Sequence, residues 1–284
     1  MSDAETLPFR TRDGLTLRVR HLMPSGPSRG TILIIHGGCE HGGRYGHLMP
    51  LFLERGWSIL LPDLRGHGLS EGVRTHVDHA DHYLQDLQDV QREFCPTAQE
   101  KVFLGHSFGG LLAIRLAQTA GMPHALVLTA PLLGLLLPVP WWKRLIGRGL
   151  TWVAPQTRFR THINPRNMTR DPAFLERRLA DPLLLRSVTA RWFFAMQDAM
   201  AAAHRQAQRL SCPILALQGL ADRTVDPTAI GRFLEQTSSA DRELMTFPEH
   251  VHEVLQESDW ESTAQHILDW LDQRLPRAAT PPGN

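Results

Sequence analysis

A sharp turn between an apolar strand and a helix most constrains what this chain can fold into. Residues 105–109 read Gly-His-Ser-Phe-Gly, with the apolar run 101–104 before them and the helix-forming run 110–117 after them. In that context the G-x-S-x-G pattern is typical of a nucleophile elbow, in which the serine hydroxyl stands above the end of a sheet. Its two glycines avoid the clash that a Cβ atom would cause in so tight a turn. The pattern predicts Ser107 as a nucleophile; the alternative is a glycine-rich turn whose serine only caps the helix.

A serine nucleophile needs a base and an orienting acid, and the later part of the chain offers both. The apolar strand 213–217 runs into Asp222, just past a strand end, where catalytic acids of open α/β sheets lie. A further strand is followed by His250 and His252, and either residue could be the base. Asp226 competes with Asp222, but the proline after Asp226 favours a cap or turn there. The order serine, acid, histidine is the one that sheet hydrolases use.

Five segments resemble the monoacylglycerol lipase and lysophospholipase branch of the α/β-hydrolases, with its serine aminopeptidase S33-type members. They are 36–45 (H-G-x-x-E-H-x-x-R-Y), 62–72 (D-x-R-G-H-G-x-S-x-G), 105–109, 221–223 and 252–257 (H-E-x-x-x-E). The resemblance spans roughly residues 10–275 and is weakest between about 132 and 208. It implies Ser107 as nucleophile, Asp222 as acid and His252 as base, with the backbone N–H groups of Gly38 and Phe108 as an oxyanion hole. Cys39 departs from the pattern, in a loop where a small residue is expected.

Alternating strands and helices predict an α/β fold with a mostly parallel central sheet and helices on both faces, as in α/β-hydrolases. The predicted strands are 15–21 at an edge, 31–35, 57–61, 101–104, 125–128, 213–217 and 243–247, and the predicted core helices include 83–94 and 260–275. We expect the hydrolase core to comprise residues 1–130 and 210–276. Residues 131–209 should form a cap, and residues 277–284 a disordered tail.

The segment between the two parts of the core is too long for a connecting loop, so we expect a helical cap inserted over the strand ends. It contains no clear strand, and helical patterns cover 174–179 and 183–204. Its apolar beginning supplies the predicted substrate-contacting residues, which are Leu132, Leu133, Leu136, Trp141 and Trp142. Two interpretations stay open for this stretch: a segment that docks on a membrane surface, or ordinary packing over an acyl tunnel. Both favour an apolar acyl-ester substrate.

Composition limits the partners and the cofactors. A net charge of +1 over 284 residues gives no reason to expect a nucleic-acid partner, and three cysteines without C-x-x-C spacing favour neither disulfides nor structural zinc. No signal-peptide pattern or long apolar run is present, so a cytoplasmic protein is expected. His76, His79 and His82 invite a metal interpretation, but spacing of three does not keep all three on one helical face. We expect no metal and no organic cofactor, and the oligomeric state is unknown.

Several polar residues near the motifs are predicted to support loops rather than to react. These are Glu40, His41, Asp63, His67 and His106. The combined motifs predict a serine hydrolase that cleaves carboxylic esters of medium or long acyl chains. Monoacylglycerols are the first expected substrate class and lysophospholipids the second. The alternatives are a small-ester carboxylesterase, an S33-type aminopeptidase, and a non-catalytic protein that binds a small apolar ligand on this scaffold.

Overall fold

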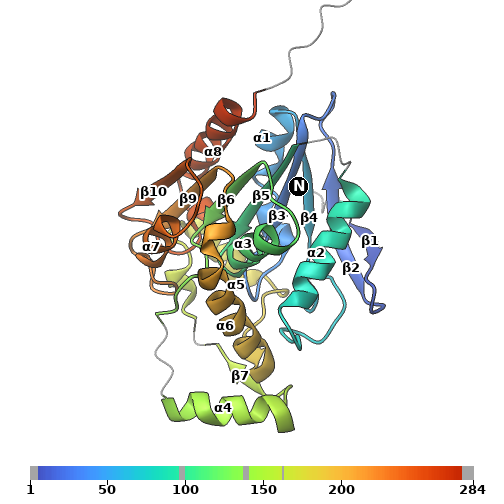
Figure 1. The fold of residues 1–284 in the computed structure, drawn as a ribbon, viewed down its shortest axis with the longest axis vertical. Helices are drawn as coiled ribbons and strands as arrows, with labels where there is room; N and C mark the ends of the chain where they lie inside the picture. Colours follow the sequence, from blue (N-terminus) through green and yellow to red (C-terminus); the bar gives the residue numbers. More distant parts are fainter. Residues whose placement is uncertain (1–5, 96–99, 137–140, 162, 277–284) are drawn as a thin grey trace, which may run out of the picture.

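An eight-stranded sheet forms the centre of the computed structural model, which describes residues 6–95, 100–136, 141–161 and 163–276 (Figure 1). The strand order is β1-β2-β4-β3-β5-β6-β9-β10, and every pair from β4 to β10 is parallel. The strands are β1 (Leu7–Arg10), β2 (Thr16–Leu22), β3 (Gly30–Ile35), β4 (Trp57–Pro62), β5 (Glu100–His106), β6 (Ala125–Thr129), β9 (Ile214–Gly219) and β10 (Arg242–Phe247). The mostly parallel sheet predicted from the sequence is confirmed.

The prediction of an edge strand at 15–21 is wrong about its position. β1 pairs antiparallel with β2 and takes the edge, so that β2 lies between β1 and β4. β1 has only four residues, mostly exposed, which is too short to show an alternating pattern in the sequence.

Helices cover both faces of the sheet because its central strands are apolar on both sides. On β3, Ile32 and Ile34 join the core under α1 and α8, whereas Leu33 and Ile35 join the core under α2, α3 and α7. The helices concerned are α1 (Met49–Glu54), α2 (Asp81–Phe94), α3 (Phe108–Thr119), α7 (Ala229–Glu235) and α8 (Trp260–Arg274). Such coverage leaves the carboxyl ends of the strands as the place where loops can gather into a site.

The segment between β6 and β9 lies over those strand ends. It contains α4 (Trp141–Val153), α5 (Pro172–Ala180) and α6 (Ala190–Arg205), and it also contains β7 (Arg158–Arg160) and β8 (Ser187–Thr189), which pair antiparallel. The expectation of a cap without strands is therefore wrong, because three-residue strands leave no period in the sequence. The helix expected from residue 183 begins at Ala190, where Thr189 accepts a hydrogen bond from the Trp192 N–H at 3.2 Å.

α6 packs against α3 of the core, and α4 packs on the outer side of α6 (Figure 1). The centroids of the Trp192 ring of α6 and the Phe108 ring lie 5.0 Å apart, and the Trp192 Nε1–H donates to the Tyr83 hydroxyl at 3.1 Å. None of the helices in the described ranges has the length and apolarity that crossing a bilayer requires. The tail predicted at 277–284 falls outside the described residues.

Candidate active site

The turn between β5 and α3 holds Ser107 in a conformation that L-residues seldom adopt. Its φ is 51° and its ψ is −117°. A Cβ on Gly105 would lie 2.5 Å from the Gly109 carbonyl oxygen, and one on Gly109 would lie 2.0 Å from that of Ile35. Both positions therefore require glycine. The turn presents the Ser107 side chain, which is partly exposed, above the carboxyl end of the sheet.

Three loops at this edge bring together the residues predicted as nucleophile, base and acid. His252 Nε2 lies 2.9 Å from Ser107 Oγ, and His252 Nδ1 lies 2.6 Å from Asp222 Oδ2. His252 follows β10 and Asp222 follows β9, and both side chains are buried. The order nucleophile, imidazole, carboxylate is the geometry that allows proton transfer from a serine hydroxyl to a histidine.

The Asp222 carboxylate is held as an anion. Burial by itself raises the pKa of this group, but the hydrogen bond from His252 and two from backbone amides outweigh burial and lower its pKa below the ordinary value. Oδ1 accepts from the N–H groups of Thr224 at 2.7 Å and Val225 at 3.1 Å. Because Oδ2 accepts from Nδ1, the imidazole keeps its Nε2 lone pair directed at Ser107.

The competing acid and histidine lie elsewhere. Asp226 accepts from the Thr228 N–H at 2.9 Å and pairs with Arg232, as a turn residue does. His250 stacks on the Phe247 ring and pairs with Asp259 at 3.0 Å. Within the described residues, neither side chain forms a hydrogen bond or ion pair with Ser107.

The loop after β3 lies beside the elbow. A Cβ on Gly38 would stand 3.5 Å from the Phe108 Cβ and 3.2 Å from the Trp192 ring, so the loop passes close to the start of α3. Among the described residues, neither the Gly38 nor the Phe108 N–H donates to a protein acceptor. Both amides are therefore available to an oxygen bound between them. The neighbouring Cys39 has a φ of 65° and a buried side chain, and burial raises the pKa of its thiol to about 12.

A buried chain of ion pairs joins this loop to the loop of His252. Glu40 accepts from the Gly37 N–H at 2.5 Å and from Arg44 Nε at 3.0 Å. Arg44 Nη2 then donates to Glu253 at 2.7 Å, and Glu253 also pairs with Arg178 of α5. The sequence predicts a supporting role for Glu40, and Arg44 and Glu253 stand in the segments 36–45 and 252–257, but nothing in the sequence indicates Arg178 or the contacts among these residues. Arg44, Arg178 and Glu253 are far apart in the chain, and only the fold brings them together.

His106 and the segment after β4 have supporting contacts. The His106 Nδ1 lies 3.1 Å from the Thr129 carbonyl oxygen. Burial lowers the pKa of His106 to about 4, and the nearby His252 ring is the second cause of this shift. Asp63 accepts from Arg20 at 3.0 Å and from the N–H of Gly42 at 2.8 Å. His41 Nε2 lies 2.9 Å from Asp181 Oδ2, and His67 Nδ1 lies 3.0 Å from the Arg65 carbonyl oxygen.

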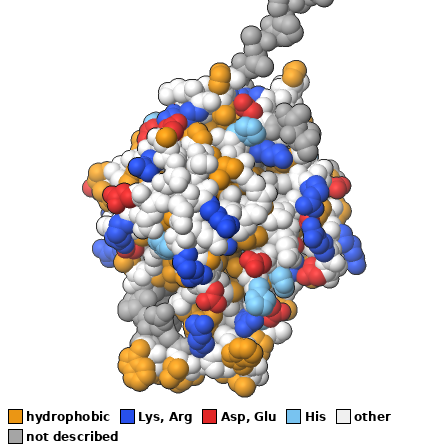
Figure 2. Space-filling model, viewed as in Figure 1, with side chains coloured by type: hydrophobic (Ala, Val, Ile, Leu, Met, Phe, Trp, Pro, Cys, Tyr) orange, Lys and Arg blue, Asp and Glu red, His pale blue; other side chains and the backbone are white. Residues whose placement is uncertain are grey.

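The residues expected to contact substrate fall into two groups. Leu132 and Leu133 are buried, and the Leu132 N–H donates to the Ser107 carbonyl oxygen at 2.9 Å. Leu136, Trp141 and Trp142 are exposed, and the two tryptophans begin α4 on the outer side of the molecule. Figure 2 shows hydrophobic side chains gathered at that end of the molecule. The tryptophans therefore face solvent, not an enclosed tunnel.

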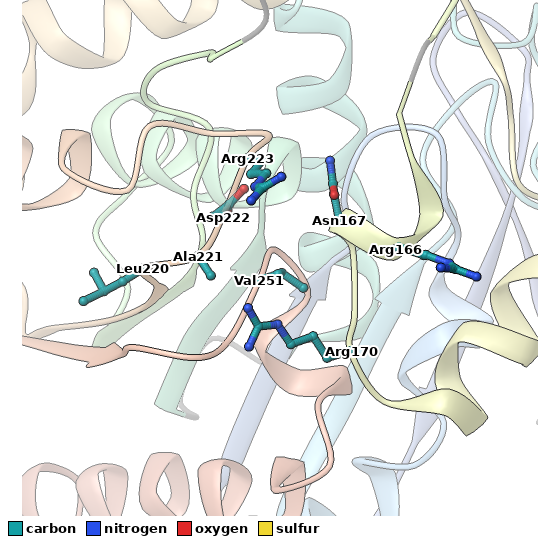
Figure 3. A pocket seen from close by; sticks show the side chains of 8 residues that line it. All are labelled: Arg166, Asn167, Arg170, Leu220, Ala221, Asp222, Arg223 and Val251. Carbon is teal, nitrogen blue, oxygen red and sulfur yellow. The ribbon is translucent and has the colours of Figure 1, made fainter.

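Two cavities of about 460 Å³ are lined by residues of the core and of the segment between β6 and β9, and Ser107 lines neither. The first adjoins Asp222 and is bordered by arginines (Figure 3). The second lies between α2, α3, α4 and α6. Within the described residues no three His, Cys, Asp or Glu side chains gather to hold a metal ion. His76 lies 3.1 Å from the Thr189 hydroxyl instead.

Comparisons with known proteins agree with this geometry. Residues 26–259 match the family model described as serine aminopeptidase, S33. The monoglyceride lipase of Homo sapiens is 30% identical over 279 residues, which cover 94% of this chain and 90% of that protein. The crystal structure of the Paleococcus ferrophilus monoacylglycerol lipase has a TM-score of 0.82 and 27% identity, covering 90% of this chain and 99% of that one. An abhydrolase domain-containing protein of Dictyostelium discoideum is 29% identical over 94% of this chain, which spans only 29% of its length.

Proposed function

The chain belongs to the serine aminopeptidase S33 family and has the α/β-hydrolase fold, and we propose that it hydrolyses monoacylated lipid esters, monoacylglycerols first. Similarity to monoglyceride lipases supports a hydrolase of lipid esters as the general class. The observation that carries the proposal is the placement of His252, which lies 2.9 Å from Ser107 Oγ and 2.6 Å from Asp222.

The proposed reaction begins with Ser107. Its Oγ attacks the ester carbonyl carbon while His252 Nε2 takes the hydroxyl proton, and Asp222 stabilises the imidazolium that forms. His252 then gives the proton to the departing alcohol, which leaves an acyl group on Ser107. Water attacks this acyl-enzyme by the same route and releases the fatty acid. Every proton in this sequence passes through His252.

The tetrahedral intermediates carry a negative oxygen that needs donors. The N–H groups of Gly38 and Phe108 have no other acceptor in the described part of the chain and lie on neighbouring segments, which supports their role as an oxyanion hole. Removal of one such donor typically costs about 3–4 kcal/mol of transition-state stabilisation. The ion-pair chain from Glu40 to Glu253 would keep the Gly38 loop and the His252 loop in register.

The outer face of α4 supports contact with a lipid surface. Its large apolar residues are exposed to solvent. The exposed fraction is 77% for Trp141, 68% for Leu145 and 84% for Trp152. They recur at intervals of four and seven residues, which keeps them on one face of the helix. We propose that this face docks on a membrane interface and that α6 connects it to the elbow. A cytoplasmic location stays a prediction.

An acyl-length series tests the substrate class. Glycerol monoesters from acetyl to dodecanoyl, kept below their aggregation limits, should show kcat/KM rising with chain length. Each buried methylene contributes about 0.8 kcal/mol, so four of them correspond to roughly a hundredfold. A flat or falling kcat/KM beyond butyrate would favour a small-ester carboxylesterase. Cleavage of amino-acyl amides in preference to esters would favour an aminopeptidase, and saturable ligand binding without turnover would favour a binding protein.

A further inference from the structure

The indole of Trp192 lies against both residues whose amides are assigned to the oxyanion hole. A Cβ on Gly38 would stand 3.2 Å from the Cη2 atom of the indole, and the centroids of the Trp192 and Phe108 rings lie 5.0 Å apart. Trp192 belongs to α6 of the cap, and only 5% of it is exposed to solvent. No step of the proposed hydrolysis uses this side chain, although it lies beside the place where the ester carbonyl must bind.

Contacts from three helices hold the indole in position. Its Nε1–H donates to the Tyr83 hydroxyl at 3.1 Å, and the Tyr83 and Phe108 rings meet edge to face with their centroids 5.4 Å apart. The backbone N–H of Trp192 donates to the Thr189 hydroxyl, which in turn donates to the Thr75 carbonyl oxygen at 3.0 Å. A close-packed ring whose polar atom is satisfied does not move aside without the loss of these contacts. The indole is therefore a fixed surface of the site.

This surface lies on the acyl side of the elbow. In the sheet, β3 and β4 lie on one side of β5, and β6, β9 and β10 lie on the other. Gly38 follows β3, and Tyr83, which binds the indole, belongs to α2, which packs against β4. His252 follows β10 and pairs with Asp222, which follows β9. Because the departing alcohol takes its proton from His252, the acyl group extends to the opposite side, where Trp192 lies.

We propose that Trp192 determines acyl specificity by excluding esters that are branched at the carbon next to the scissile carbonyl. The inference rests on the proposed hydrolysis of monoacylated esters and narrows their acyl group to straight chains. When the Gly38 and Phe108 N–H groups hold the carbonyl oxygen, that carbon is only two bonds from the oxygen and lies beside the indole. A straight chain places hydrogens against the ring at this point. A branch places a methyl group there, and overpacking against a fixed ring is unfavourable.

The test compares two isomers that differ only in the branch, 1-butanoylglycerol and 1-(2-methylpropanoyl)glycerol. Each kcat/KM is divided by the rate of hydroxide-catalysed hydrolysis of the same ester, so that the quotient of the two values reports the preference of the enzyme alone. We expect the native enzyme to prefer the straight chain roughly 10- to 200-fold, which is the range for one methyl group in a pocket. Trp192→Ala should reduce this preference about tenfold by raising kcat/KM on the branched ester.

Two milder variants guard against a loss of folding in Trp192→Ala. Trp192→Phe keeps an aromatic ring and should also reduce the preference. Tyr83→Phe keeps the ring contacts but removes the hydroxyl that binds the indole, so it should reduce the preference by a smaller factor. Trp270→Phe is the matched control, because Trp270 is a buried tryptophan of α8 on the opposite face of the sheet. This variant should leave the preference unchanged.

A second pair of isomers moves the branch to the alcohol. The Trp192 variants should discriminate between propyl butanoate and 2-propyl butanoate as the native enzyme does. A change confined to this pair would place the indole on the alcohol side and overturn the inference. A native preference near one for the acyl pair, or an undiminished preference in the folded Trp192 variants, would also overturn it, while turnover of 1-butanoylglycerol would leave the proposed function standing. Absence of turnover of every ester by the native enzyme would instead overturn the proposed function.

Discussion

The loops around Ser107 and the outer face of α4 belong to one molecule but follow opposite physical rules. At the loops, the polar groups of Asp222 and Glu40 are buried and each oxygen has a donor. On α4, the large apolar groups of Trp141 and Trp152 are exposed to solvent. Buried, satisfied polar groups fix positions, which chemistry needs. Exposed apolar groups lower solubility unless another surface covers them, which a lipid interface does. The contrast separates the reacting region proposed around Ser107 from the docking region proposed on α4.

The largest effect should come from Ser107→Ala. Loss of the Ser107 hydroxyl should lower kcat for a soluble short ester by about four to six orders of magnitude, because the nucleophile and the base act as a unit. The melting temperature should stay close to the native value, since the hydroxyl forms a hydrogen bond with His252 alone among the described side chains. Initial rates and thermal denaturation measure the two quantities. Turnover in a preparation of this variant free of other esterases would contradict the assignment.

The next effect separates the paired candidates of the reacting region. Asp222→Asn should lower kcat by about 10⁴, because an amide cannot hold the imidazole in the required tautomer. Asp226→Asn is its matched control and should keep most of the activity, since Asp226 caps a turn. The same comparison applies to His252→Ala and His250→Ala. A reversed order in either pair would show that the base or the acid is misassigned.

The elbow could be predicted because local contacts fix its glycines, whereas the choice of Asp222 and His252 over Asp226 and His250 came from the family resemblance. Gly105 and Gly109 are required by contacts within a few residues or with the adjacent strand, so the pattern is visible in the sequence. The link from Glu253 to Arg178 could not be predicted, because the two residues are 75 positions apart and Arg178 stands in none of the recognised motifs. Charged residues in such pairs look in a sequence like ordinary surface residues.

The cap was less predictable than the core for a different reason. β7 and β8 have three residues each and, within the described ranges, pair with no other strand, so no hydrophobic period marks them. The tryptophans that begin α4 carry an apolar signal, but a sequence does not say whether such a signal is buried or exposed. Only their exposed fractions separate a tunnel lining from an outer surface. The central strands β3 and β4, in contrast, are apolar on both faces and can be recognised from that feature.

The third effect concerns acid stability, which should depend on the reacting region. Burial lowers the pKa of His106 to about 4, from an ordinary 6.5. Between those two pH values the folded chain binds fewer protons than the unfolded chain. The contribution of His106 to the free energy of unfolding is therefore fully present above about pH 6.5 and is lost as the pH falls toward 4. A shift of this size corresponds to about 3 kcal/mol.

Urea unfolding of the native protein and of His106→Asn at pH 7 and pH 4.5 measures this difference. The variant should lose less stability than the native protein between the two pH values. His79→Asn, at an exposed position before α2, serves as the control. An identical loss in the native protein and His106→Asn would contradict a neutral, buried His106.

The smallest effect should come from the docking region and should appear on one kind of substrate only. Trp141→Ala and Trp152→Ala should each weaken binding to phosphatidylcholine–phosphatidylglycerol vesicles about tenfold, because each removes a large apolar contact. Activity on a soluble short ester and the melting temperature should stay near native values. Leu7→Ala, an exposed apolar residue of β1 at the sheet edge, is the control. Equal losses on vesicles and on the soluble ester would mark the tryptophans as packing residues.

Covalent labelling tests the central claim most directly. Native protein and the Ser107→Ala variant are treated with a fluorophosphonate, with and without excess monoacylglycerol, and the modified peptide is identified by mass spectrometry. We expect a single adduct on Ser107, slower labelling when monoacylglycerol is present, and no adduct on the variant. An adduct on another residue, or no adduct on a native protein that still hydrolyses esters, would contradict the claim that Ser107 is the nucleophile.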